Sequence, residues 1–205
     1  MKKSYKLNDV IFVIFSLFSV FAFLFCLFIK QQFYAYQFLF LFLCLFVPTI
    51  VEFVFKIKIN LFIQLTFYFY LILHFVLGEV FEFYVNYEFY DTLLHYSTAV
   101  LLSVLGYSIM HYYLNDNLLF LQILFAFLFS VSCEFYWEIL EFTVDHFFNT
   151  NMQRFIENGE VLVGHNALKD TIKDMLVANI GSSSIIFLSK IKFIKNLKIS
   201  IKKCL

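Results

Sequence analysis

Long apolar runs separated by short polar segments make up most of the chain. Each run holds about 17 to 27 residues, and about 20 helical residues cross the ~30 Å hydrocarbon core of a bilayer. The pattern predicts an all-α fold, a polytopic six-transmembrane helix bundle in which residues 1–205 form a single integral-membrane domain. The expected spans are about 10–29, 33–51, 61–77, 92–113, 118–144 and 171–189, followed by a basic tail at 190–205.

The composition supports a membrane protein. Hydrophobic residues make up 62% of the chain and aromatic residues 22%, and the mean hydropathy is +0.83. These values exclude an ordinary soluble domain, and we expect membrane lipids, and no nucleic acid, as partners. The four cysteines show no metal-ligand spacing, so we interpret them as small hydrophobic residues.

The net charge of zero conceals an asymmetry between the two sides of the expected membrane protein. With six spans, eleven of the fifteen Lys and Arg residues fall on the side that carries both termini. By the positive-inside rule, both termini are predicted to be cytoplasmic. Most of the acidic residues fall on the opposite side, which we therefore expect to face outward.

The fifth run contains an unusual set of acids, Glu134, Glu138, Glu141 and Asp145. At about 100° per residue their offsets around a helix are roughly 0°, 40°, −20° and 20°, so all four share one face. An unpaired charge inside a membrane costs several kcal/mol. Water at the helix end would account for Asp145 and for Glu141, but it does not easily account for the other two.

Two i,i+4 pairs are expected at the same depth as this stripe: Asp91 with His95, and Asp170 with Asp174. The nearby cations, Arg154, Lys169 and Lys173, are too few to pair every acid. Crowded carboxylates must then either bind a cation or share protons. Oxygen ligands with one imidazole suit Mg²⁺, Mn²⁺ or Zn²⁺. The predicted metal ligands are Asp91, His95, Glu138, Asp170 and Asp174, and the predicted general base is Glu134 or Glu141.

A structural interpretation competes with this one, because Asp–His and Asp–Lys contacts can simply fasten helices together. Small residues at Ala99, Ser103, Gly106 and Gly181 would also let the fourth and sixth spans approach closely. His74 and His111 are expected to be packing residues, and Trp137 is expected to belong to an interfacial aromatic belt.

Several segments around these residues carry a family resemblance. They are Tyr90–His95, Trp137–Phe142 with Asp145, Asn149–Gln153, and Asp170–Thr171 with Asp174 and Gly181. Over roughly residues 75–185 the chain resembles the YjdF-like family of bacterial inner-membrane proteins, and the VanZ-like membrane proteins offer a more distant analogy. The resemblance implies a multi-pass location in the bacterial cell inner membrane and supports the choice of residues. It implies no reaction, and the long 153–169 loop departs from the pattern.

Three functions remain open from the sequence. The first is a metal-dependent hydrolase or transferase that acts on a lipid-linked or small-molecule substrate near the outer leaflet, although cations to hold a phosphate are scarce. The second is a proton- or cation-coupled transporter with Glu134 and Glu138 as a relay, although the inner halves of the last three spans lack acids. The third is a non-catalytic scaffold. Nothing in the sequence sets the oligomeric state.

Overall fold

The computed structural model describes residues 7–54, 56–114, 118–157, 159–195 and 200–201. Within these ranges it contains helical segments that are long and apolar enough to cross a membrane, which confirms the all-α polytopic class. The segments are Asp9–Phe28, Gln32–Val54, Leu61–Val80, Glu88–Leu114, Leu119–Phe148 and Lys169–Leu188. Half of the predicted basic tail (196–199 and 202–205) and the polar turn at 115–117 lie outside the described residues.

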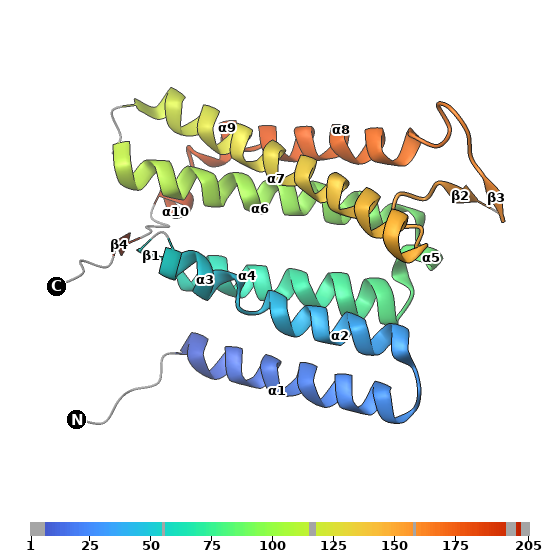
Figure 1. Cartoon of the computed structure of the whole chain (residues 1–205). Helices are drawn as coiled ribbons and strands as arrows, with labels where there is room; N and C mark the ends of the chain where they lie inside the picture. The colour runs from blue at the N-terminus through green and yellow to red at the C-terminus, as the bar shows by residue number, and fades with distance from the viewer. Residues whose placement is uncertain (1–6, 55, 115–117, 158, 196–199, 202–205) are drawn as a thin grey trace, which may run out of the picture. The chain divides into compact units, whose positions relative to one another are not determined.

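The chain divides into two compact units, which we describe separately (Figure 1). The N-terminal unit comprises residues 1–90 and 199–205, and the C-terminal unit comprises residues 91–198. The expectation of a single integral-membrane domain stays a prediction.

The N-terminal unit is built around an apolar core. Helix α1 packs against α2, and both contact the segment formed by α4 and the π-helix η1. Buried apolar side chains from all four elements, among them Ala35, Phe38, Leu41 and Phe75, form one cluster. The elements are α1 Leu7–Phe28, α2 Gln32–Cys44, α3 Val47–Val54, β1 Ile57–Lys58, α4 Leu61–Leu71, η1 Ile72–Val80, α5 Phe83–Asn86 and β4 Ser200–Ile201.

Two irregularities in this unit follow from local sequence. The second span breaks between α2 and α3, just before Pro48, because proline lacks an N–H and restricts the preceding residue. Pro48 then occupies the first turn of α3, where a missing N–H costs little. The third span ends as the π-helix η1, which hydropathy did not predict.

The C-terminal unit consists of long helices joined by a short hairpin. Strands β2 and β3 pair antiparallel, with Glu157 opposite Glu160, between α7 and α8. The elements are α6 Glu88–Leu114 (whose first three residues precede the unit boundary), α7 Leu119–Phe148, β2 Ile156–Glu157, β3 Glu160–Val161, α8 Lys169–Ser183, α9 Ile185–Leu188 and α10 Lys192–Lys195.

Small residues bring α6, α7 and α8 close together. A Cβ added at Gly181 of α8 would collide with the main-chain oxygen of Tyr96 on α6, and Ala99 lies beside it. A Cβ at Gly106 would lie 3.0 Å from the Cα of Ala126 on α7. These contacts confirm the expected close approach of the fourth and sixth spans at Ala99 and Gly181.

Helix α7 turns a polar face into the unit. Its buried residues are Gln122, Ala126, Ser130, Glu134, Glu138, Glu141 and Asp145, which repeat every three or four positions. Large apolar side chains of α7, such as Phe120, Leu128 and Phe142, are exposed instead. This inversion is what a lipid-facing helix requires when its protein-facing side carries a polar site. The four acids do share one buried face, as the helical offsets predicted.

Candidate metal centre

His95 of α6 is the centre of the polar cluster. Its ring is 7% exposed, and its two nitrogens face two different carboxylates. Nε2 lies 3.6 Å from Oδ1 of Asp91, one turn earlier on the same helix. Nδ1 lies 3.2 Å from Oε2 of Glu134 on α7. The imidazole therefore links α6 to the acidic face of α7.

Asp174 of α8 completes a group of three potential ligands. Asp91, His95 and Asp174 each offer one ligand atom, and these atoms all lie within 4.8 Å of one another. Asp174 is 2% exposed, and the Asp91 side chain is 13% exposed. Asp91 and Asp170 lie in the first turns of α6 and α8, where the helix dipole favours negative charge.

The buried carboxylate of Glu138 is a further feature beside this group. Its side chain is 5% exposed, and neither carboxylate oxygen accepts a hydrogen bond from the described residues. Thr171 and Gln153 lie close enough to interact with this carboxylate, but their own side chains hydrogen-bond to each other at 2.9 Å. His95 and Asp170 interact electrostatically with the same carboxylate. A buried carboxylate without hydrogen bonds is costly in its ionised form unless it binds a cation or takes up a proton.

Two cations approach the cluster from its rim. Arg154 lies 3.6 Å from Asp91 and 3.9 Å from Asp170. Lys173 lies 3.9 Å from Asp170 and 3.8 Å from Asp174. Both cations are about one-third exposed, which weakens their effect on the buried acids. Asp170 is thus held mainly by Arg154 and Lys173.

Asp145 organises the loop that carries Arg154, a role that the sequence pattern did not predict. Its carboxylate accepts hydrogen bonds from the Thr150 hydroxyl at 2.6 Å and from the backbone N–H groups of Met152 and Gln153 at 2.7 and 2.9 Å. Asn149 and Arg154 both have positive φ, 52° and 50°. An aspartate at a helix end followed by Asn-Thr-Asn is a signal for such a turn.

Glu141 lies one turn beyond Glu138 on the same buried face of α7, toward Asp145. One of its oxygens accepts a hydrogen bond from the indole N–H of Trp137 at 2.8 Å, and Glu138 and Asp91 both interact electrostatically with it. The expectation of an interfacial Trp137 did not anticipate this bond. The structure thus brings all seven predicted site residues into one unit. Their roles as ligands or bases remain predictions.

Below the acids the polar face continues as a packed contact. The Ser130 hydroxyl donates to the main-chain oxygen of Ala99, and the Ser182 hydroxyl donates to Ser130, both at 2.8 Å. One turn further, Ala126 meets Gly106 at close range. The described part of this unit is therefore tightly packed beneath the cluster.

Comparison with known proteins places the chain in a family. Neither the curated proteins nor the solved structures give a match. Residues 11–193 match the family described as "Predicted membrane protein (DUF2238)". The match covers most of the chain, including every segment of the candidate metal centre, and it confirms the YjdF-like resemblance. The chain therefore belongs to the DUF2238 family of membrane proteins.

Proposed function

We propose that the protein binds one divalent cation at Asp91, His95 and Asp174, with Glu138 as a further ligand. The observation that carries this proposal is the grouping of three ligand atoms within 4.8 Å, beside a buried carboxylate that accepts no hydrogen bond from the described residues. Three carboxylates and one imidazole suit Mg²⁺, Mn²⁺ or Zn²⁺. Asp170 is assigned as an outer ligand, because it lies outside the group of three ligand atoms and faces both Arg154 and Lys173.

The charge balance supports a cation. The cluster holds six carboxylates, Asp91, Glu134, Glu138, Glu141, Asp170 and Asp174, whereas the Lys and Arg side chains that contact it among the described residues are Arg154 and Lys173. Like charges a few ångströms apart repel by several kcal/mol outside bulk water. A divalent cation relieves this repulsion while the carboxylates stay ionised.

The bond between His95 and Glu134 fits a metal-binding histidine. An ionised carboxylate can only accept, so Nδ1 carries a proton, and in the metal-bound protein Nε2 would offer its lone pair on the side of Asp91. Histidines that bind metals commonly donate their other N–H to a carboxylate in this way. Glu134 is then a positioning residue, which leaves Glu141 as the general base.

The chemistry that suits this arrangement is hydrolysis or group transfer on a lipid-linked substrate. A cation held by Asp91, His95, Asp174 and Glu138 would supply Lewis-acid chemistry, polarising a substrate oxygen and activating water at neutral pH. The water oxygen bonds to the electrophilic carbon or phosphorus, and Glu141 takes the released proton. The bond to the leaving oxygen breaks, and that oxygen receives the proton. In the transferase variant, a hydroxyl of the acceptor replaces water.

The packing beneath the cluster favours such a one-sided site over a transporter. A proton relay through α7 would have to continue below Ser130, where Gly106 and Ala126 are in close contact. A scaffold would not need the buried Glu138 carboxylate to lack hydrogen bonds.

We also propose a location in the bacterial inner membrane, with both termini cytoplasmic and the metal centre near the outer leaflet. The distribution of lysines supports this orientation. Reporter fusions after Tyr84 and within 155–165 should then report the outer side, and a fusion at the C-terminus should report the inner side. An outer signal at the C-terminus would contradict the orientation.

Thermal unfolding of the detergent-purified protein tests the metal site. Mn²⁺ or Zn²⁺ should raise the melting temperature. At a free cation concentration of 100 times Kd, binding adds about 2.7 kcal/mol to the free energy of unfolding. The shift should disappear in His95→Ala and Asp174→Asn and persist in Glu88→Gln, which replaces an exposed acid on the same helix.

The contrary result is equally specific. The protein could instead purify without metal, show no change of melting temperature with cations, and become more stable as pH falls toward 5. Its folded state would then bind more protons than the unfolded chain. The carboxylates would then share protons, and the transporter would be favoured.

A further inference from the structure

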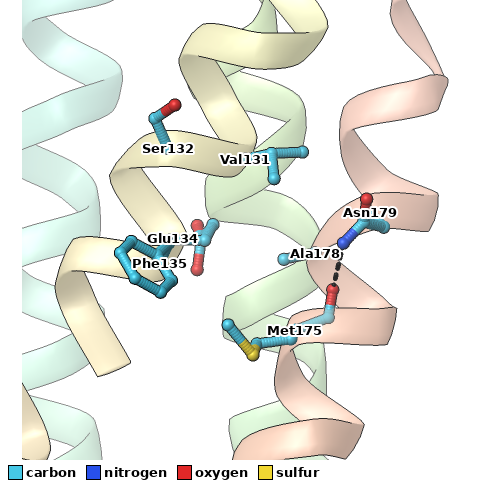
Figure 2. A pocket seen from close by; sticks show the side chains of 7 residues that line it. All are labelled: Val131, Ser132, Glu134, Phe135, Met175, Ala178 and Asn179. Carbon is cyan, nitrogen blue, oxygen red and sulfur yellow. Dashed lines mark hydrogen bonds between the residues drawn. The ribbon is translucent and has the colours of Figure 1, made fainter. Parts of the chain in front are cut away.

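A pocket of about 340 Å³ lies between α7 and α8, next to the metal centre. Val131, Phe135, Met175 and Ala178 form its apolar walls, and Glu134 forms part of its lining. Figure 2 shows these side chains arranged around the Glu134 carboxylate. The volume is at the lower end of the range of about 300–1,000 Å³ that is common for ligand pockets.

The polar atoms of the pocket leave little for a polar ligand to bind. The Asn179 amide donates to the main-chain oxygen of Met175, and the Ser132 hydroxyl donates to that of Leu128. Glu134 uses Oε2 to bind His95, and its Oε1 has almost no exposed surface. An occupant is therefore held by apolar contact rather than by hydrogen bonds.

The depth of the pocket indicates the source of its occupant. Glu134 stands at the midpoint of α7, and Met175 begins the second third of the segment Lys169–Leu188. In a spanning helix these positions lie within the hydrocarbon layer. Beside the pocket, Phe135, Leu176 and Ile180 are 47%, 60% and 65% exposed, as side chains that contact lipid are.

We propose that this pocket holds the hydrocarbon chain of a membrane lipid, inserted between α7 and α8. Glu134 lines the pocket and contacts His95, so a lipid whose hydrocarbon chain lies in the pocket has its polar end within reach of the proposed cation. The placement of the lipid's polar end beside the cation rests on the proposed function. It identifies the substrate of that function as an acyl- or prenyl-chain lipid. A chain in the pocket also keeps water away from the bond between Glu134 and His95, which strengthens it.

Photo-crosslinking tests the occupant. The full chain is placed in nanodiscs of phosphatidylethanolamine and phosphatidylglycerol that contain a phospholipid with a diazirine midway along one acyl chain. Irradiation and peptide mass spectrometry should find adducts on Phe135 and Met175. Met175→Phe fills the pocket and should remove the Phe135 adduct. Leu176→Phe adds the same ring to the neighbouring exposed position and should leave this adduct in place.

A second variant, Val131→Phe, fills the pocket from the side of α7 and should also remove the adducts. The test therefore does not depend on the folding of a single variant. Phe135 labelling that persists in both filled variants would overturn the pocket as a chain site. Labelling that behaves as expected in a protein with no cation-dependent melting shift would keep the lipid site and reject the proposed metal chemistry. A melting shift without labelling would reject the lipid site alone.

Discussion

A half-buried acid of the N-terminal unit and two buried acids of the C-terminal unit differ in how many hydrogen bonds their carboxylates accept. In the N-terminal unit, Glu52 accepts hydrogen bonds from Lys58, from the Gln64 amide and from the backbone N–H of Ile59. In the C-terminal unit, Glu138 accepts none from the described residues, and Asp174 has one buried oxygen without a hydrogen bond. The first pattern is structural, because the acid is satisfied where it stands. The second pattern is the basis of the proposed cation site.

The cores of the two units differ in the same sense. Buried apolar residues dominate the N-terminal unit, whereas the buried residues of α7 are polar apart from Ala126. Apolar packing contributes stability without requiring a ligand, and a buried polar face is costly unless it is satisfied. The comparison predicts that substitutions in the N-terminal unit change stability alone, whereas substitutions in the C-terminal unit also change ligand binding.

The largest expected effect is steric. Gly181→Ala places a methyl group against the main-chain oxygen of Tyr96, which cannot move away without shifting α6. Overpacking of this kind costs about 1–3 kcal/mol, and it should also abolish the cation-dependent melting shift. In the N-terminal unit Gly78→Ala meets the Tyr84 ring instead of backbone, so it should cost less and leave the shift intact. Thermal unfolding with and without Mn²⁺ measures both effects.

The next effect concerns the positioning role of Glu134. Glu134→Gln keeps the size of the side chain but weakens its hold on His95 Nδ1–H, so Mn²⁺ affinity should fall by about 10–100-fold. Calorimetric titration measures the affinity. Glu134→Asp should recover part of it if the carboxylate orients His95. Unchanged affinity in the glutamine variant would assign the His95 contact to packing.

Unfolding without metal should separate the two kinds of acid. Glu52→Gln weakens a satisfied network and should lower stability by about 1–2 kcal/mol. Glu138→Gln removes an unpaired buried charge, so stability without metal should stay constant or rise. Equal losses in both variants would remove the distinction between the units.

The smallest effect is expected in the loop. Asp145→Asn removes the negative charge that holds three donors, so the turn that presents Arg154 should loosen at a cost of about 1 kcal/mol. Arg154 then screens Asp91 and Asp170 less well, and the melting temperature should depend more steeply on salt concentration. Glu157→Gln, an exposed change in the β2–β3 hairpin, is the matched control.

Hydropathy and helical periodicity were sufficient for the spans and for the acidic face, because both depend on regular spacing along one helix. They also placed Asp91 and His95 on one stripe. They did not reveal the bond between Glu134 and His95, since this contact depends on how two helices rotate against each other. The sequence pattern also did not predict that Arg154 approaches Asp91 and Asp170, because a loop with two residues at positive φ has no periodic signature. The π-helix η1 likewise has no periodic signature in the sequence.

The central claim is that one divalent cation occupies the C-terminal unit with a single imidazole ligand. Electron paramagnetic resonance of the purified protein titrated with Mn²⁺ tests this directly, because coupling to ¹⁴N reports a histidine ligand. We expect one bound Mn²⁺ per chain, with ¹⁴N coupling that is absent in His95→Ala and unchanged in His111→Ala. Absence of stoichiometric binding, or ¹⁴N coupling that persists in His95→Ala, would contradict the account.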